Sequence, residues 1–342
     1  MPPKTKNKFS YYSFDKIYSF NATYMFIIGA RGLGKTYGAK KRVINNYLRN
    51  GEQFIYLRRY NTELRSRGTF FADIAHEFPD WHFRVIGKEA QVAPYEPDPK
   101  KREWETMGYF VPLSTAQTQK SVAYPAVTTI IFDEFIIEKG ALHYLPNEAK
   151  AMNEFYSTVD RWQDKTRVLF LANAVSIMNP YFLEYDIKPD EVGEYARFAD
   201  GFIATHFADS KQFASEVFQT KFGQFIKDTE YAEFSVTSQF SDNHKKMVKF
   251  KPSNAKYYCT IETPKGMFSV WIDFMGPLYY VQEKRPKNEL IYTFVPELMD
   301  NDKVLLFYSD KIAQYLRSAF RNGKVFFSNP KSRNAFVELF KR

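Results

Sequence analysis

The stretch that most constrains the fold of this chain begins at Met25 and reads "MFIIGARGLGKTYGAK". From Gly29 to Thr36 it follows the pattern G-x-x-x-x-G-K-[ST], which binds nucleotide phosphates where a buried strand turns into a helix. Glycines permit positive φ angles, so successive backbone N–H groups can surround an anion. Apolar residues precede the pattern, and apolar residues at helical spacing follow it up to Gly51. The sequence therefore predicts a strand, a phosphate-binding loop and a helix, in that order.

Each residue type in this loop has a physical reason. The start of the helix directs its positive dipole end and its free amides towards the anion. Lys35 adds a positive charge that also serves catalysis, and the Thr36 hydroxyl can bind Mg²⁺. We therefore expect ATP and Mg²⁺ as cofactors; the alternative is a glycine-rich turn without a ligand. The remaining phosphate contacts are expected from Gly29, Ala30, Arg31, Gly32, Leu33 and Gly34.

A second informative stretch is "VTTIIFDEF", residues 127–135. It predicts a buried central strand with Asp133 at its carboxyl tip, where open α/β sheets bind their ligands. We expect Asp133 to hold Mg²⁺, in part through water, opposite Thr36. Glu134 follows directly and is expected to accept a proton from an attacking water. The alternative is a strand end with two solvated acids.

A third strand, "RVLFLANA", leads to Asn173. If this strand lies next to the one that carries Asp133, the amide of Asn173 can contact the γ-phosphate or position water, because an amide both donates and accepts hydrogen bonds. A turn-forming asparagine is the alternative.

Hydrolysis needs positive charge on the phosphate beyond Lys35. In the predicted helix before the third strand, the apolar residues of 152–162 lie on one face, which puts Arg161 on the opposite face. An exposed arginine there reaches its own site with difficulty, but it can reach the site of a neighbouring subunit in a ring. Arg167, Lys120 and a merely solvated Arg161 remain alternatives.

Composition limits the class of protein. The 342 residues suffice for two domains, and the net charge of +9 favours a polyanionic partner such as nucleic acid. Cys259 is the only cysteine, so no disulfide forms within the chain and a reducing compartment fits. No apolar run approaches the length that spans a bilayer, so we expect an intracellular protein without membrane contact.

The pattern of short apolar runs predicts two domains. Residues 1–178 alternate strand and helix patterns, which indicates an α/β domain with a mostly parallel sheet flanked by helices. Residues 179–205 are predicted to be a linker, and residues 206–342 a smaller α+β domain. That last part carries 21 Lys and Arg against 15 Asp and Glu. In that domain we expect four β segments, residues 234–240, 255–263, 267–274 and 277–283, then a helix through residues 312–320 and a short final helix, residues 334–340. The strands expected in the first domain are residues 25–28, 53–57, 82–86, 109–113, 128–132 and 168–171. The stretch "VAPYEPDPKKRE" from Val92 is rich in proline and charge, which indicates an excursion or insertion.

Several longer stretches, taken together, are specific to fewer protein families than any nucleotide-binding motif. The chain resembles the DNA-packaging ATPase, or encapsidation protein, of small short-tailed phages with protein-primed genomes. The resemblance is dense over residues 15–185 and looser towards the carboxyl end. It is carried by "IIGARGLGKTYGAK", "GEQFIYLRRY", "AYPAVTTIIFDEF", "LPNEAKAMNEFYSTVDR" and "LANAVSIMNPYF".

The resemblance implies an additional-strand catalytic-glutamate P-loop ATPase domain, followed by an RNase H-like domain without cleavage activity that binds nucleic acid. It implies a ring of five copies at the portal protein of an empty prohead, attached through a packaging RNA, that moves double-stranded DNA inward. Such a protein is expected in the host cytoplasm and transiently at the portal vertex, not in the mature virion. By the same resemblance Lys35 and Thr36 bind phosphate and Mg²⁺, Asp133 binds the metal, Glu134 is the catalytic base and Arg161 acts in trans.

Other functions stay open from the sequence. An active nuclease needs several clustered carboxylates for two metals. Asp273 lies where one such acid could sit, but Asp228, Glu230 and Asp242 do not complete a convincing set. A P-loop phosphotransferase and a portal component that binds nucleotide only for assembly are further alternatives. The candidates for contact with DNA are Arg58, Arg59, Lys245, Lys246, Lys249 and Lys251.

Overall fold

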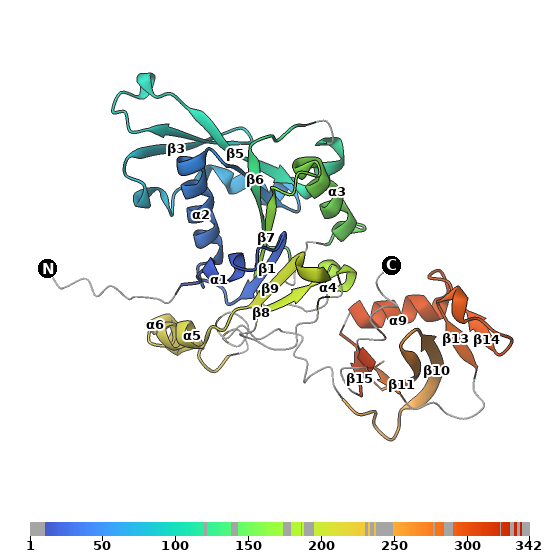
Figure 1. Ribbon diagram of the computed structural model, residues 1–342. Coiled ribbons are helices and arrows are strands. Elements are labelled where there is room, and N and C mark those ends of the chain that lie inside the picture. Colours follow the sequence, from blue (N-terminus) through green and yellow to red (C-terminus); the bar gives the residue numbers. More distant parts are fainter. Residues whose placement is uncertain are drawn as a thin grey trace. The chain divides into compact units, whose positions relative to one another are not determined.

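The structure is a computed structural model, and the chain forms two compact units, residues 1–241 and 242–342 (Figure 1). In the described part of the chain, no helix combines the length and the apolar character needed to cross a bilayer. The structure describes residues 11–119, 122–137, 143–173, 179–185, 187, 195–229, 232, 236, 249–275, 278–283, 290–321, 323–328, 332, 333 and 336.

A nine-stranded sheet forms the centre of the first unit, in the order β3-β4-β5-β2-β6-β7-β1-β9-β8. The strands from β5 to β9 in this order are parallel, whereas β4 and β8 run antiparallel to their neighbours. The strands are β1 (Tyr24–Gly29), β2 (Gln53–Arg58), β3 (Trp81–Ile86), β4 (Glu89–Pro94), β5 (Glu105–Pro112), β6 (Val127–Asp133), β7 (Arg167–Asn173), β8 (Tyr195–Phe198) and β9 (Ile203–Phe207).

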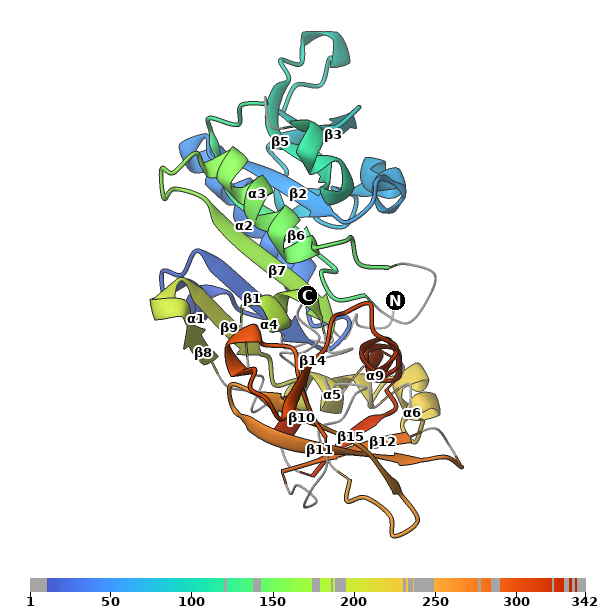
Figure 2. The ribbon, with the colours of Figure 1, turned by 90° about the vertical axis from the view of Figure 1, so that its right-hand side faces the viewer.

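Helices cover both faces of this sheet, with α2 and α3 on opposite sides (Figure 1). Figure 2 shows α3 lying over the sheet and running roughly along the direction of β7. The helices are α1 (Asp15–Tyr18), α2 (Lys35–Asn50), α3 (Glu148–Asp160), α4 (Pro180–Glu184), α5 (Lys211–Val217) and α6 (Lys221–Ile226). The 3₁₀ segments are η1 (Asn61–Thr69), η2 (Ala75–Glu77), η3 (Pro99–Lys101), η4 (Leu113–Gln119) and η5 (Ala199–Gly201).

The central strands are buried on both faces, which explains their nearly continuous apolar sequences. All six residues of β1 are buried. On one face, Phe26 stacks on Phe170 with ring centroids 4.1 Å apart, and Phe155 of α3 belongs to the same cluster. On the other face, Val43 and Ile44 of α2 pack against the sheet. The six strands expected from the sequence in this unit are confirmed, as is the predicted helix that ends before Gly51.

The strand order also matches the predicted class of ATPase fold. Strand β7 lies between β1, which leads into the phosphate-binding loop, and β6, which ends in Asp133. This is the additional strand of that class. The register places Gly29 beside Asn173. Because these strands are parallel, their carboxyl ends meet at one edge of the sheet.

Two expectations about this unit are wrong. Strand β4 occupies part of a stretch, from Val92 onward, that its prolines and charges suggested to be an excursion. The predicted linker, residues 179–205, contains α4, β8 and most of β9, and Tyr24 of β1 pairs with Ile203. The division between the units falls after Ser241, not at residue 205, because β9 completes the first sheet.

The second unit contains a six-stranded sheet in the order β14-β13-β10-β11-β12-β15. Helix α9 (Lys311–Arg321) packs against β12 and β15. Three of the four β segments expected there, and the helix, are confirmed; most of the segment 234–240 and most of the expected final helix, 334–340, lie outside the described residues. The strands are β10 (Lys256–Thr263), β11 (Gly266–Asp273), β12 (Leu278–Gln282), β13 (Ile291–Thr293), β14 (Lys303–Leu305) and β15 (Val325–Phe327), with η6 (Pro296–Leu298) before β14.

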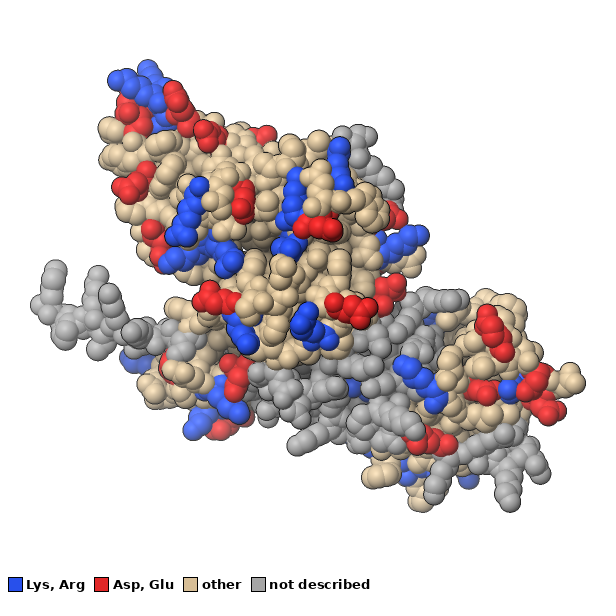
Figure 3. Space-filling model, viewed as in Figure 1, with Lys and Arg blue, Asp and Glu red and all other residues tan. Residues whose placement is uncertain are grey.

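The distribution of charged side chains on the surface bears on the expected contact with nucleic acid. On the face in Figure 3, Lys and Arg side chains are interspersed with Asp and Glu over both units. Lys249 lies over the ring of Phe326 at 4.4 Å, and Lys251 lies over Trp271 at 4.3 Å. Both amines therefore have aromatic neighbours within the unit. DNA contact by these lysines stays a prediction.

The contact between β2 and β5 supplies a test of the sheet. The ring of Phe54 covers Gly108, and a Cβ atom at Gly108 would lie 2.6 Å from that ring. We expect Gly108→Ala to lower the free energy of unfolding by about 1–3 kcal/mol, because the overpacked ring must move. Urea unfolding followed by tryptophan fluorescence measures the change. The control is Gly68→Ala, where a Cβ would meet no atom within 4 Å; equal midpoints for both variants would contradict the register.

Candidate nucleotide-hydrolysis site

The phosphate-binding loop connects β1 to α2 in the conformation that its glycines allow. Gly32 and Gly34 have φ angles of +81° and +85°. Beneath the loop, Ala30 and Leu33 are buried in one cluster with Phe213 of α5. This apolar cluster packs against one side of the loop, so the backbone amides of the loop remain available to an anion on the other side.

Lys35 is almost fully buried at the start of α2. Its amine donates to the carbonyl oxygens of Gly29 at 3.0 Å and Ala30 at 2.7 Å. It also donates to the side-chain oxygen of Asn173 at 3.3 Å. The structure thus brings together the lysine and the asparagine that the sequence singled out, although they are 138 residues apart in the chain.

Asp133, at the tip of β6, accepts hydrogen bonds from three directions. The Thr36 hydroxyl lies 3.2 Å and 3.1 Å from its two oxygens, the Tyr56 hydroxyl donates at 2.7 Å, and the Glu134 backbone N–H donates at 3.1 Å. Burial, and then the charge of Asp133, raise the pKa of Tyr56 far above its usual value, so Tyr56 remains a donor. These contacts fix the orientation of the carboxylate.

The donor set fits Mg²⁺. This ion prefers oxygen ligands at about 2.1 Å in octahedral geometry, so two adjacent ligands lie about 3 Å apart. The separation of Thr36 and Asp133 matches that spacing. Among the described residues, no group of three or more His, Cys, Asp or Glu is placed to hold a metal. The fit therefore concerns an ion shared between these two oxygens, nucleotide phosphates and water.

Glu134 follows Asp133 with a left-handed backbone, φ +56°. Its carboxylate is more than half exposed and forms an ion pair with Arg58, at the end of β2. Arg58 also pairs with Glu63 at 3.0 Å. Burial is the largest single influence on the pKa of Arg58 and lowers it, but Glu134, Tyr56, Asp133 and Glu63 together outweigh burial, so the net shift is upward. Arg58 therefore stays positively charged between two carboxylates.

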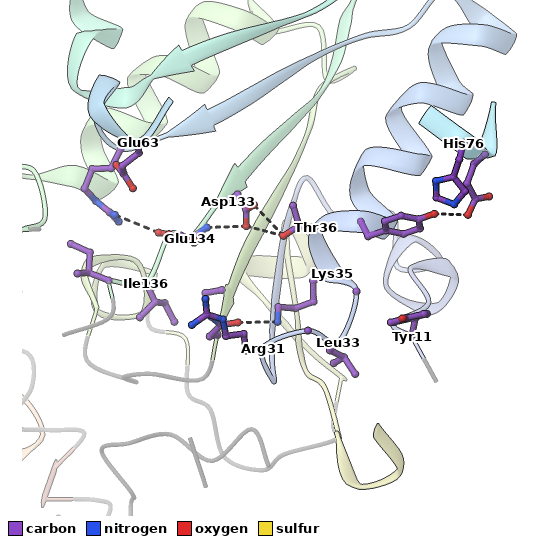
Figure 4. A pocket seen from close by; sticks show the side chains of 18 residues that line it. Tyr11, Arg31, Leu33, Lys35, Thr36, Glu63, His76, Asp133, Glu134 and Ile136 are labelled. Atoms are coloured by element: carbon purple, nitrogen blue, oxygen red, sulfur yellow. Dashed lines mark hydrogen bonds between the residues drawn. The ribbon is translucent and has the colours of Figure 1, made fainter. Parts of the chain in front are cut away.

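These residues line one pocket of about 960 Å³. It includes the loop from Arg31 to Tyr37, Asp133, Glu134 and Asn173. In Figure 4, Glu63, Glu134 and Ile136 lie on one side of Lys35 and Thr36, whereas Tyr11 and His76 lie on the other. A nucleotide whose phosphates contact Lys35 thus has acids beside one end and aromatic rings beside the other.

Arg161 does not line this pocket. Glu148 begins α3 and pairs with Arg59, which contacts the carbonyl oxygen of Phe135. Arg161 follows the last residue of the same helix, with φ +52°. Over 13 residues the helix spans about 20 Å. Arg161 is exposed, as expected, but for a different reason: the helix ends at Asp160, and Trp162 is 89% exposed instead of continuing the apolar face.

The end of α3 is fixed by Asp160. Its buried carboxylate accepts hydrogen bonds from the backbone N–H groups of Gln163, Asp164, Lys165 and Thr166, at 2.9–3.1 Å. These contacts close a tight loop that presents the Arg161 side chain to solvent. The apolar spacing of the helix did not predict this stop.

The other residues expected to act on the phosphate or to contact DNA either lie away from the pocket or are paired with groups inside the protein. Arg167 donates to the side-chain oxygen of Asn21 at 3.0 Å. Arg59 is 1% exposed, so its assignment as a DNA contact is wrong: its charge is neutralised inside the protein by Glu148. Arg58, expected to contact DNA, instead contacts the proposed base. Lys120, Lys245 and Lys246 lie outside the described residues.

The nuclease hypothesis gains no support within the described residues. Asp273 accepts hydrogen bonds from Asn254 at 3.3 Å and from the Met275 backbone at 3.0 Å, and no cluster of metal-binding acids surrounds it. Glu230 and Asp242 lie outside the described residues.

Comparison with known proteins identifies the family. The sequence profile described as podovirus DNA encapsidation protein (Gp16) matches residues 6–342. The chain belongs to this family. A DNA packaging protein of Bacillus phage B103 is 37% identical over 328 residues, which cover 95% of this chain and 98% of that protein.

Solved structures of the same family agree with the fold. A chain of the bacteriophage phi-29 viral genome packaging motor assembly is 35% identical and matches with a TM-score of 0.64, covering 97% of this chain and 99% of that chain. The N-terminal domain of the DNA packaging ATPase from bacteriophage phi29 is 39% identical, with a TM-score of 0.53, covering 59% of this chain and 98% of that domain. The predicted α/β ATPase fold and a second, smaller sheet unit are therefore confirmed.

Nucleotide binding at this pocket can be tested without measuring turnover. Mg²⁺ and ATP at about 100 times the Kd should stabilise the folded chain by about 2.7 kcal/mol, which scanning fluorimetry detects as a higher Tm. Lys35→Ala should lose most of that shift, because the loop loses its cation. Lys249→Ala, in the second unit, is the control and should keep it. The same nucleotide-induced shift in both variants would argue against this pocket.

Proposed function

We propose that this chain is an ATP hydrolase that moves double-stranded DNA into a viral prohead as a subunit of a ring-shaped packaging motor. The observation that carries the proposal is one pocket that joins a phosphate-binding loop, the Thr36–Asp133 pair and Glu134, in a chain of the encapsidation family. The relatives named above are a DNA packaging protein and part of a genome packaging motor assembly.

The chemistry follows from the residues in the pocket. Thr36 and Asp133 would hold Mg²⁺, which neutralises charge on the phosphates when it is bound. The Lys35 amine would exchange its carbonyl partners for the phosphates. Glu134 would take a proton from water as the water oxygen attacks the γ-phosphorus and the bond to the β-phosphate oxygen breaks, releasing ADP and phosphate.

Glu134 must leave its ion pair with Arg58 before it can act as a base. The contact of Arg58 with Glu63 supports such a change, because a second carboxylate already neutralises the guanidinium. Until the pair separates, Arg58 binds the carboxylate of Glu134, which lowers its ability to accept a proton from water.

A ring completes the site. Arg161 caps the end of α3 opposite to Glu148 and is exposed, which supports a role at the site of a neighbouring subunit. We propose a pentameric ring on the portal protein, attached through a packaging RNA and present in the host cytoplasm and transiently at the portal vertex. The second unit would be a nuclease-like domain that binds nucleic acid without cutting it.

The proposed base predicts a separation of binding from turnover. Glu134→Gln should reduce steady-state phosphate release by about 10²-fold or more, because the amide cannot accept the proton. Binding of a fluorescent ATP analogue should persist. Unchanged turnover in this variant would show that another group activates the water.

The trans role of Arg161 predicts complementation. Arg161→Ala alone and Glu134→Gln alone should each be inactive, but rings mixed from both should regain partial phosphate release on proheads with DNA. Only the mixed interface joins an intact Glu134 to an intact Arg161. Arg167→Ala is the matched control and should retain activity by itself. If mixing restores nothing, Arg161 is a structural residue.

A further inference from the structure

The end of strand β2 carries a buried ion pair that the proposed reaction does not use. Arg59 and Glu148 have side chains that are 1% and 0% exposed. The guanidinium of Arg59 donates to both oxygens of Glu148, at 2.7 Å and 2.9 Å. The rings of Phe132 and Tyr144 lie 5.8 Å and 4.9 Å from it. The pair is thus removed from water on every side described.

The same guanidinium also binds the main chain directly after the Mg²⁺-binding strand. It donates to the carbonyl oxygen of Phe135 at 2.6 Å and lies 3.4 Å from that of Glu134. Glu134 has a left-handed backbone, which is costly for a residue with a side chain and persists only where its surroundings impose it. Arg59 supplies part of that constraint.

Glu148 is fixed in turn. Its carboxylate accepts hydrogen bonds from the Tyr181 hydroxyl at 2.8 Å and from the Leu145 backbone N–H at 2.8 Å. Tyr181 belongs to α4, and Glu148 is the first residue of α3. Through Glu148 and Tyr181, the guanidinium of Arg59 is therefore linked to helices α3 and α4. The same guanidinium contacts the main chain at Glu134 and Phe135.

Stability alone does not account for this arrangement. A buried ion pair contributes little net stability, and well-packed apolar residues of similar volume often replace it without loss. Apolar side chains, however, cannot donate hydrogen bonds to two backbone carbonyl groups. What the charged pair adds is control over the position of the main chain at Glu134.

We propose that Arg59 and Glu148 are positioning residues that set the main-chain position of Glu134 for attack by water. The inference rests on the proposed role of Glu134 as the base. Two consecutive arginines then act on the same glutamate at two levels: Arg58 binds its carboxylate, and Arg59 holds its backbone.

The test replaces the pair by apolar residues in the full chain. In Arg59→Met/Glu148→Leu we expect Tm within a few degrees of wild type and an unchanged Kd for a fluorescent ATP analogue. On proheads with DNA, kcat should fall by about 10²-fold with KM within about twofold, because a misplaced base slows chemistry without weakening binding. Glu148→Gln keeps the side-chain volume and should lower kcat by about tenfold.

The matched control is Tyr24→Phe. It removes a partly buried hydrogen bond to the side-chain oxygen of Asn153 in α3, at 3.0 Å, and does not touch Glu134. Its kcat should equal that of wild type. A folded double variant with wild-type kcat would overturn the proposal, as would a loss confined to nucleotide affinity. If the double variant does not fold, a wild-type kcat in Glu148→Gln overturns it equally.

Glu134→Gln, measured in parallel, separates this inference from the proposed function. If that variant is inactive while the pair variants turn over normally, only the positioning role is lost. If Glu134→Gln itself turns over at the wild-type rate, Glu134 is not the base, and both proposals are overturned.

Discussion

A hydrogen bond between Thr36 and Asp133 joins two segments of this chain that are 97 residues apart. It exists because β1, β7 and β6 are adjacent and parallel, so that the loop after one strand and the acid at the tip of another reach the same edge. Asn173 reaches that edge from β7. The other contacts of the candidate site depend on this arrangement, because the end of a buried strand determines where each polar group lies.

Around this edge, the acids are controlled by donors from β2. Tyr56 orients Asp133, Arg58 pairs with Glu134, and Arg59 holds the backbone after β6. These side chains come from the last three residues of one strand and the residue that follows, so a single neighbouring strand governs both carboxylates. Low exposure strengthens the contacts of Tyr56 with Asp133 and of Arg59 with the main chain, because water competes with them little. The geometry of the site therefore depends on β2 as much as on the phosphate-binding loop and on the strand that ends in Asp133.

Local patterns predicted a large part of this structure. The glycines before Lys35 and the apolar run before Asp133 determine local structure through residues adjacent in the sequence. They can therefore be interpreted for any fold that buries the two strands. The roles of Arg58 and Arg59 depend on which strand lies beside β6, and two adjacent arginines usually indicate a solvated surface. Helical spacing found the buried face of α3 but extended it to Trp162, because the four backbone hydrogen bonds of Asp160 leave no trace in apolar periodicity. Strands β8 and β9 were missed for a similar reason: β9 pairs with β1, which is far away in the sequence, and β8 pairs with β9 at the edge of the sheet.

The central claim is that hydrolysis at this pocket drives the movement of DNA, and its most direct test records both quantities at once. Phosphate release and DNA entry would be followed together on empty proheads carrying the full chain, with ATP and Mg²⁺ supplied. The account predicts that both begin on addition of ATP and stop together when a non-hydrolysable analogue replaces it. DNA entry without phosphate release, or no phosphate release from assembled complexes, would contradict it.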